Sequence, residues 1–232
     1  MSTGISFDNA APFEIMSAPF QVYRAPLGTA FPEVDVVPAT PWVLIGTSGD
    51  LNYGPDGVSV QHAQSVNYWR SLGSAGVRKV FRASEDLTIS LSVADMSLEM
   101  YRLAIESPTI VTVAGGVGTA GTKSIGLSRG LNVETFALLV KGPSPYGDDM
   151  ASQYEIPMCC NGGEPEVVYR MDGPAMLALK FIALEDPSAT DPRERMGRLV
   201  AQTDPGTLVA RDAEPGAPDG AAPPAAKDDG YR

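Results

Sequence analysis

A single histidine, His62, limits the catalytic chemistry open to this chain. A Ser-His-Asp or Cys-His arrangement would have to use it, because such mechanisms need an imidazole that takes a proton from the nucleophile. His62 ends the alternating run at residues 58–62, and no serine or cysteine stands in a recognisable nucleophile elbow. We therefore interpret His62 as a surface residue of a strand.

Cys159 and Cys160, the two cysteines of the chain, are neighbours. Adjacent thiols are poorly placed to cross-link a fold through a disulfide or to complete a tetrahedral metal site by themselves. A zinc site would need His62 together with both cysteines or with carboxylates, and the spacing gives no support for it. We predict reduced cysteines in the core, and neither a metal nor a cofactor.

Three pairs of carboxylates are candidates for catalytic or calcium-binding groups: Glu85 with Asp86, Asp148 with Asp149, and Glu164 with Glu166. Two acids can hydrolyse a glycosidic bond or hold calcium. Each pair falls where the composition predicts a turn, and turns are commonly acidic because they are solvated. We favour solvated turns and predict no catalytic residue, while a hydrolase that uses one of these pairs stays an alternative.

Residues 116–121 have the GxGxxG spelling of a dinucleotide site. That motif works through a helix whose N-terminus follows the glycines directly and holds the pyrophosphate. Here residues 122–126 follow, which alternate in polarity and contain another glycine, so no helix is expected. The pattern favours a flexible hairpin loop.

The formal net charge of −11 argues against tight binding of nucleic acid, because neutralising phosphates needs Lys and Arg. Arg78, Lys79 and Arg82 form the one basic cluster. It is too small for a nucleic-acid interface and well placed to meet an acidic neighbouring subunit.

The stretch at residues 75–108 predicts how a strand and a helix follow one another. Residues 87–93 alternate apolar and small polar side chains, which is typical of a half-buried strand. Apolar residues then recur at helical spacing, at Met96, Met100, Leu103 and Ala104. Asp95 or Ser97 can cap this helix and Pro108 stops it, so we expect a helix of about three turns.

The rest of the chain predicts short strands separated by Gly and Pro, of which there are 24 and 20. We expect a turn at 83–85 and a hairpin in which 153–160 pairs with 167–171 across 161–163. Further strands are expected at 20–23, 41–46, 58–62, 77–81, 109–113, 122–127, 133–140 and 175–184. The predicted fold is mainly β, a two-sheet β-sandwich or barrel with one flanking α-helix.

Composition divides the chain into three parts. Residues 1–19 lack periodicity and predict an extended N-terminal arm, and residues 20–186 hold the β domain. Residues 187–232 form an Ala/Pro/Asp-rich C-terminal extension, with a short helix expected at 193–200. No signal peptide or long apolar run is recognisable, so we expect no export, no membrane span and folding in the cytosol.

The order of four segments resembles the major tail tube proteins of long-tailed bacteriophages. They are VYRAPLGTAFP at 22–32, WVLIGT at 42–47, EDLTISL at 85–91 running into LEMYRLA at 98–104, and MLALKFIALED at 176–186. None is a specific motif alone, and their order carries the resemblance.

The resemblance implies a two-sheet β fold with one helix, whose subunits close into hexameric rings that stack into a hollow tube for DNA ejection. The resemblance extends to the proteins that form the inner tubes of contractile tails and of type VI secretion systems. The implied partners are copies of the chain itself, terminator, tape measure and baseplate or distal tail proteins, and DNA in transient, non-specific passage. The implied location is the virion tail, after assembly in the host cytoplasm, with no enzymatic activity.

Two expectations follow for surfaces. An acidic or hydroxylic bore would let DNA slide, since duplex DNA carries about one negative charge per 1.7 Å, and Thr88, Ser90 and Ser92 are candidates for its lining. Residues 1–19 and 114–121 are expected to become ordered at contacts between subunits. The alternative function is a carbohydrate-binding or capsid-decorating β-sandwich of a virion, for which Trp42, Tyr68 and Trp69 would form an exposed aromatic platform.

Overall fold

The computed structural model describes residues 20–46, 52–106, 109–167, 169, 171 and 173–204. Strands make up 49% of the chain, which confirms the mainly β class. The predicted N-terminal arm and the part of the extension beyond residue 204 lie outside the described residues.

Eight antiparallel strands form one large sheet. In order across the sheet they run β2-β1-β7-β8-β9-β4-β3, and β10 also pairs with β8. Their bounds are β1 (Gln21–Pro26), β2 (Val43–Leu44), β3 (Tyr53–Trp69), β4 (Lys79–Val93), β7 (Thr135–Ser144), β8 (Gly147–Asn161), β9 (Leu177–Ala183) and β10 (Arg198–Ala201). The sheet does not close into a barrel.

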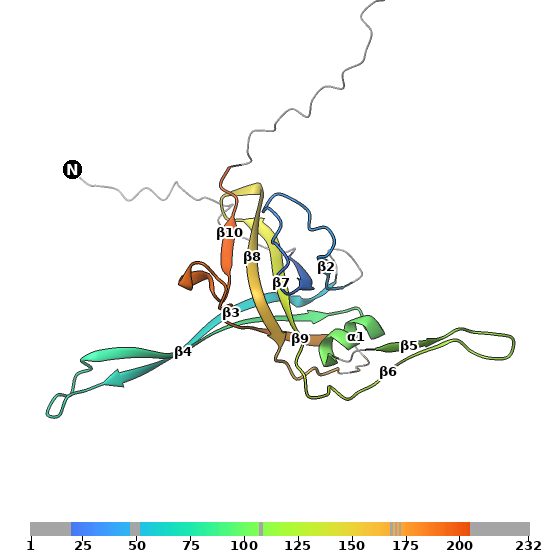
Figure 1. Cartoon of the computed structure of the whole chain (residues 1–232), viewed down its shortest axis with the longest axis horizontal. Helices are drawn as coiled ribbons and strands as arrows, with labels where there is room; N and C mark the ends of the chain where they lie inside the picture. Colours follow the sequence, from blue (N-terminus) through green and yellow to red (C-terminus); the bar gives the residue numbers. More distant parts are fainter. Residues whose placement is uncertain are drawn as a thin grey trace, which may run out of the picture.

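The long strand β8 lets the sheet curve. Its residues 152–155 pair with β10, whereas Cys159, Cys160 and Asn161 pair with β9. In Figure 1, β7, β8 and β10 run upright while β3, β4 and β9 run across them. This change of partner along one strand allows the two groups of strands to face a common core.

The alternation predicted for residues 87–93 is confirmed. Leu87, Ile89, Leu91 and Val93 of β4 are buried in the main core, and the side chains between them are partly exposed. Strand β7 is buried on both faces, since residues 136, 138 and 140 enter the main core while 137 and 139 enter a second cluster. Phe136 meets Phe181 of β9 edge to face, with ring centroids 5.6 Å apart.

Helix α1 (Leu98–Ile105) begins where the sequence predicts. Ser97 is the N-cap, and its side chain accepts a hydrogen bond from the backbone N–H of Met100 at 3.3 Å. The helix has 8 residues, fewer than the three turns expected, and ends before Pro108. Glu106 takes a left-handed conformation with φ 54°, which turns the chain out of the helix.

The predicted turn at residues 83–85 is wrong. Strand β4 runs unbroken through it, because β3 pairs with β4 along nearly its whole length and Ser65 lies opposite Ser84. The strand predicted at residues 58–62 is correspondingly the middle of a 17-residue strand. Cross-strand pairing has overridden local composition here.

The predicted hairpin across residues 161–163 is also wrong. Strand β8 pairs with β9, and Val167 makes only an isolated bridge to Leu177. The helix expected at 193–200 is replaced by one 3-10 turn, Pro192–Glu194, followed by β10. Strand β10 thus places part of the predicted C-terminal extension in the sheet.

Two hairpins project from the body in opposite directions (Figure 1). One is the outer part of β3 and β4. The other consists of β5 (Ile110–Val113) and β6 (Thr122–Ile125), which form a separate two-stranded sheet. These arms carry much of the exposed apolar surface of the described chain.

Candidate assembly surfaces

The candidate catalytic residues, His62 and the two cysteines, lie on different strands. His62 is exposed on β3, opposite Leu87 of β4. Cys159 is buried on β8, and its thiol donates a hydrogen bond to the carbonyl of Phe136 at 3.3 Å. No contact joins the imidazole to either thiol, so the structure shows no pair of nucleophile and base among these residues.

The two cysteines are free thiols. Burial raises the pKa of the Cys159 thiol far above its ordinary value. Burial also raises the pKa of Cys160, with the Glu106 carboxylate adding to the effect. Both residues therefore favour the protonated thiol, which is a poor nucleophile and a poor metal ligand.

The carboxylate pairs occupy three different settings. Glu85 and Asp86 are exposed on β4, where Glu85 accepts a hydrogen bond from Arg82 at 2.8 Å. Asp149 lies near the start of β8, and the side chain of Asp148 is outside the description. Glu164 stands in the loop after β8 and lines a shallow groove. Only this last pair is in a loop throughout, so the turn setting predicted for the first two pairs is wrong: Glu85 and Asp86 lie within β4, and Asp148 and Asp149 lie within β8.

The GxGxxG stretch is a hairpin loop, as predicted. Gly116 and Thr119 exchange two backbone hydrogen bonds of 3.0 Å, which close a turn around Val117 and Gly118. Gly118 has φ +77°, a conformation that glycine adopts without strain. A strand, β6, follows the loop, so the helix N-terminus that would hold a pyrophosphate is missing at this place.

Among the described residues, no three His, Cys, Asp or Glu side chains gather as a metal site. Within the same ranges, no helix has the length and apolar character needed to cross a membrane.

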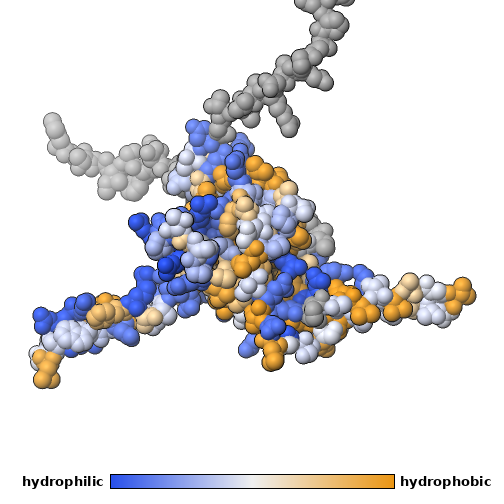
Figure 2. All heavy atoms as spheres, in the orientation of Figure 1, coloured by the Kyte–Doolittle hydropathy of each residue, from blue (hydrophilic) through white to orange (hydrophobic). Residues whose placement is uncertain are grey.

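The first arm, residues 63–84, is called the basic arm. It holds four bases, Arg70, Arg78, Lys79 and Arg82, and no acid, in a chain whose net charge is −11. Lys79 lies over the ring of Phe81, with Nζ 4.9 Å from the centroid. Figure 2 shows apolar residues at the tip and polar residues along the arm.

Both faces of the basic arm carry exposed apolar side chains. Tyr68 lies opposite Val80, whereas Trp69 and Phe81 lie on the other face because neighbouring strand residues point to opposite sides. These four side chains are 49 to 60% exposed, and Leu72 at the tip is fully exposed. Within the described chain nothing covers this apolar surface.

The second arm, residues 110–125, is called the glycine arm. Val111, Val113 and Val117 are at least half exposed on it. At its base Lys123 donates to Glu99 of α1 at 2.8 Å, which ties the arm to the helix. That hydrogen bond is the main reason why the pKa of Glu99 lies below its ordinary value.

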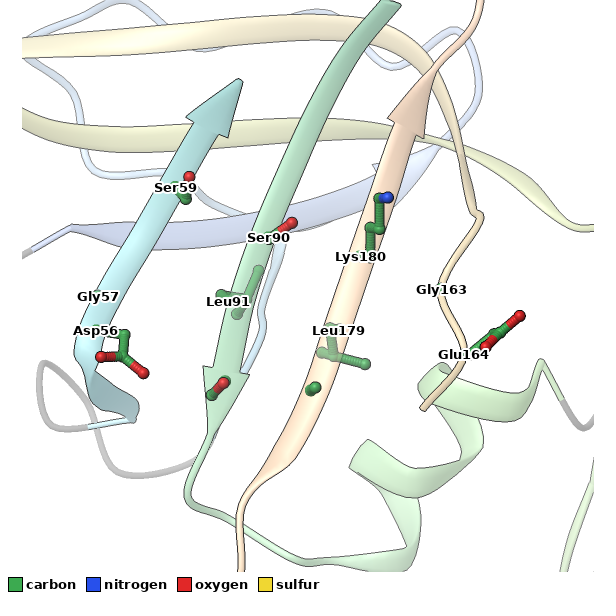
Figure 3. A pocket seen from close by; sticks show the side chains of 11 residues that line it. Asp56, Gly57, Ser59, Ser90, Leu91, Gly163, Glu164, Leu179 and Lys180 are labelled. Atoms are coloured by element: carbon green, nitrogen blue, oxygen red, sulfur yellow. The ribbon is translucent and has the colours of Figure 1, made fainter. Parts of the chain in front are cut away.

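The outer face of β3, β4 and β9 is called the serine face. Ser59, Ser90 and Lys180 lie side by side across the three strands. Together with Ser92 and Ala178 they line a shallow groove of about 340 Å³, and Asp56 and Glu164 lie at its ends (Figure 3). Ser90 and Ser92, two of the three hydroxyl residues expected in a DNA-tolerant lining, thus line one groove with two acids and one base. Thr88, the third, lies farther along β4, between Gln61 and Ile182, and does not line the groove.

The predicted aromatic platform does not form as one surface. Trp42 is only 7% exposed, packs against Phe31 with centroids 5.2 Å apart, and donates its indole N–H to the carbonyl of Ala30. Tyr68 and Trp69 are exposed, yet they lie on opposite faces of the basic arm. This observation weakens the carbohydrate-binding alternative.

The sequence matches no protein-family model, and no curated protein is similar to it in sequence.

Proposed function

We propose that this chain is the structural subunit of a phage or phage-like tail tube, which assembles into stacked hexameric rings around a bore that conducts DNA. The proposal joins the resemblance in the order of segments to one observation, the two hairpin arms with exposed apolar residues. It assigns no catalytic residue, no cofactor and no metal. The other tail proteins and passing DNA are the proposed partners.

The arms carry the proposal because a two-stranded hairpin is at best marginally stable alone in water. Residues 63–69 of β3 extend roughly 24 Å at about 3.4 Å per residue. Apolar side chains on both faces of such an arm mark a surface that a partner covers. Because the two arms point in opposite directions, each copy can reach two neighbours (Figure 1).

The serine face is the proposed lining of the bore. Short hydroxyl side chains and the carboxylates of Asp56 and Glu164 offer passing DNA few cations to hold it. Lys180 is the single base among the described residues that line the groove. A few scattered bases slow DNA much less than a continuous basic surface, because the electrostatic part of affinity grows with the number of neutralised phosphates.

The two-sheet arrangement of the tail-tube fold belongs to the same proposal. We assign β2, β1, β7, β8 and β10 to one layer and β9, β4 and β3 to the other. Support comes from the main core, where Val22 and Leu138 of the first group meet Ile89 and Phe181 of the second. The helix α1 adds Leu103 to the same cluster.

Electron microscopy of the purified protein at rising concentration tests the proposal, with sedimentation velocity alongside. We expect rings or hollow tubes. A single small particle at every concentration and salt condition would contradict the proposed function.

A shortened basic arm tests the observation that carries the proposal. Replacing residues 66–83 by Asn-Gly joins Ser65 to Ser84, which lie opposite one another, through a favoured two-residue hairpin turn. Because the removed residues contribute nothing to the buried core, the melting temperature should hold while assembly is lost. Normal tubes from the shortened protein would show that the basic arm is not an assembly surface.

A further inference from the structure

An acidic groove lies on the body around the ion pair of Arg198 and Glu155. Two shallow hollows of about 470 and 210 Å³ share Phe31, Glu155 and Arg198 in their walls. We call these two hollows together the acidic groove. Its carboxylates are Glu33, Asp35, Glu155, Asp186, Glu194 and Asp204, and Arg198 is the one base among its described lining residues.

A buried amide in the groove wall holds the central carboxylate, Glu155, in place. The side chain of Gln153 is 1% exposed and lines the larger hollow. Its Nε2 donates to the carbonyl of Pro32 and to Oε1 of Glu155, both at 2.7 Å. These two acceptors fix the orientation of the amide, and they leave Oε1 of Gln153 without a donor among the described residues.

The groove also has apolar walls. Phe31, Val34 and Val200 line the larger hollow, and Pro157 and Ala189 line the smaller one. An occupant that combines cations with apolar side chains would match both the carboxylates and the apolar walls of the groove.

The basic arm has this combination on the same polypeptide. It places Lys79 on the same face as Trp69 and Phe81, whereas Arg82 shares the other face with Val80. Arg78 directly precedes Lys79, and residues 63–84 contain no acid that a carboxylate-lined groove would repel. Arginine side chains are also frequent donors to carboxylate oxygens at interfaces.

We propose that the basic arm of one copy docks in the acidic groove of a second copy. The contact joins two different patches, so it repeats from copy to copy and generates a ring or a stack. This inference rests on the proposed function only because it takes a second copy of the chain as the occupant of the groove. It adds which two surfaces are in contact, the basic arm and the acidic groove.

Charge reversal on each surface tests the docking. Arg78→Glu with Lys79→Glu should raise the concentration needed for self-association by about tenfold or more, because like charges then face each other. Glu33→Lys with Glu194→Lys in the groove should weaken association similarly. The four changes together restore opposite charges across the contact, so this variant should recover association.

Arg193→Glu with Arg195→Glu is the matched control. It changes the net charge by the same amount through exposed residues outside the arm and outside the groove lining. This variant should associate like the wild type, and the melting temperatures of all variants should agree because the exchanged side chains are not in the core.

The outcomes separate the inference from the proposed function. The docking is contradicted, and the proposed tube is not, if the protein with reversed charges on the arm forms tubes like the wild type. The same holds if the variant with all four substitutions forms tubes no better than the variants with two. If the wild type forms only small oligomers that arm reversal dissociates, the docking holds and the tube fails. A wild type that never self-associates overturns both.

Discussion

Nε of Arg198 on β10 donates to Oε2 of Glu155 on β8 at 2.6 Å. The carboxylate is 4% exposed and the guanidinium is half exposed, so the pair joins the wall of the acidic groove to the large sheet. The second carboxylate oxygen accepts from Gln153 at 2.7 Å. Interaction with Glu155 raises the pKa of Arg198, which keeps the guanidinium charged.

Arg198→Met should destabilise the fold by about 1–3 kcal/mol, since it leaves a buried carboxylate without its charged donor. Thermal or urea unfolding measures the change. The control is Arg193→Met, whose ion pair with Asp191 is long and exposed and should contribute almost nothing. Equal losses in the two variants would show that burial of Glu155 is not the cause.

Asn161→Ala should loosen helix α1. Nδ2 of Asn161 donates to the carbonyls of Leu103 and Ala104 at 3.1 and 2.7 Å. These two buried hydrogen bonds connect β8 to the end of the helix. Leaving these carbonyls with fewer donors costs about 1–3 kcal/mol of unfolding free energy. Asn67→Ala, in the exposed basic arm, is the control and should leave the melting temperature unchanged.

Tyr53 should make stability fall at high pH. Its hydroxyl donates to the carbonyl of Ile45 and accepts from the N–H of Val22, and burial raises its pKa to about 12. An unfolded tyrosine loses its proton near pH 10. Between about pH 10 and 12 the unfolded state therefore binds fewer protons than the folded state, and stability falls as pH rises.

Urea unfolding of the wild type and of Tyr53→Phe at a series of pH values isolates this effect, because the other tyrosines titrate in both proteins. The stability advantage of the wild type should be constant below about pH 9 and shrink above pH 10. A constant advantage up to pH 12 would contradict the assignment.

The tip of the glycine arm should change its hydrogen exchange on assembly. Gly116 and Thr119 hold only a two-residue turn there, and Val117 is fully exposed, so amides of residues 114–121 should exchange rapidly in the isolated subunit. Assembly should slow them about tenfold or more as the apolar tip is covered. Equal exchange in subunit and tube would remove this tip from the assembly contacts.

Several local features of this protein could be predicted from the sequence. Side-chain alternation identified the buried face of β4, and glycines without a following helix identified a hairpin loop. Two capping residues, Asp95 and Ser97, placed the start of α1 to within two positions, and the structure selects Ser97. These features depend on residues within a few positions of one another, so their periodicity and capping chemistry are visible in the sequence.

Only the tertiary structure decided which elements meet. The pairing of β8 with β9, the unbroken β4 and the entry of β10 into the sheet depend on contacts between distant segments, for which turn composition is a weak guide. The acidic groove likewise gathers Glu33, Glu155 and Glu194 from three separate parts of the chain. Such pairings are set by burial in a shared core and by loop closure, which no local window of sequence contains.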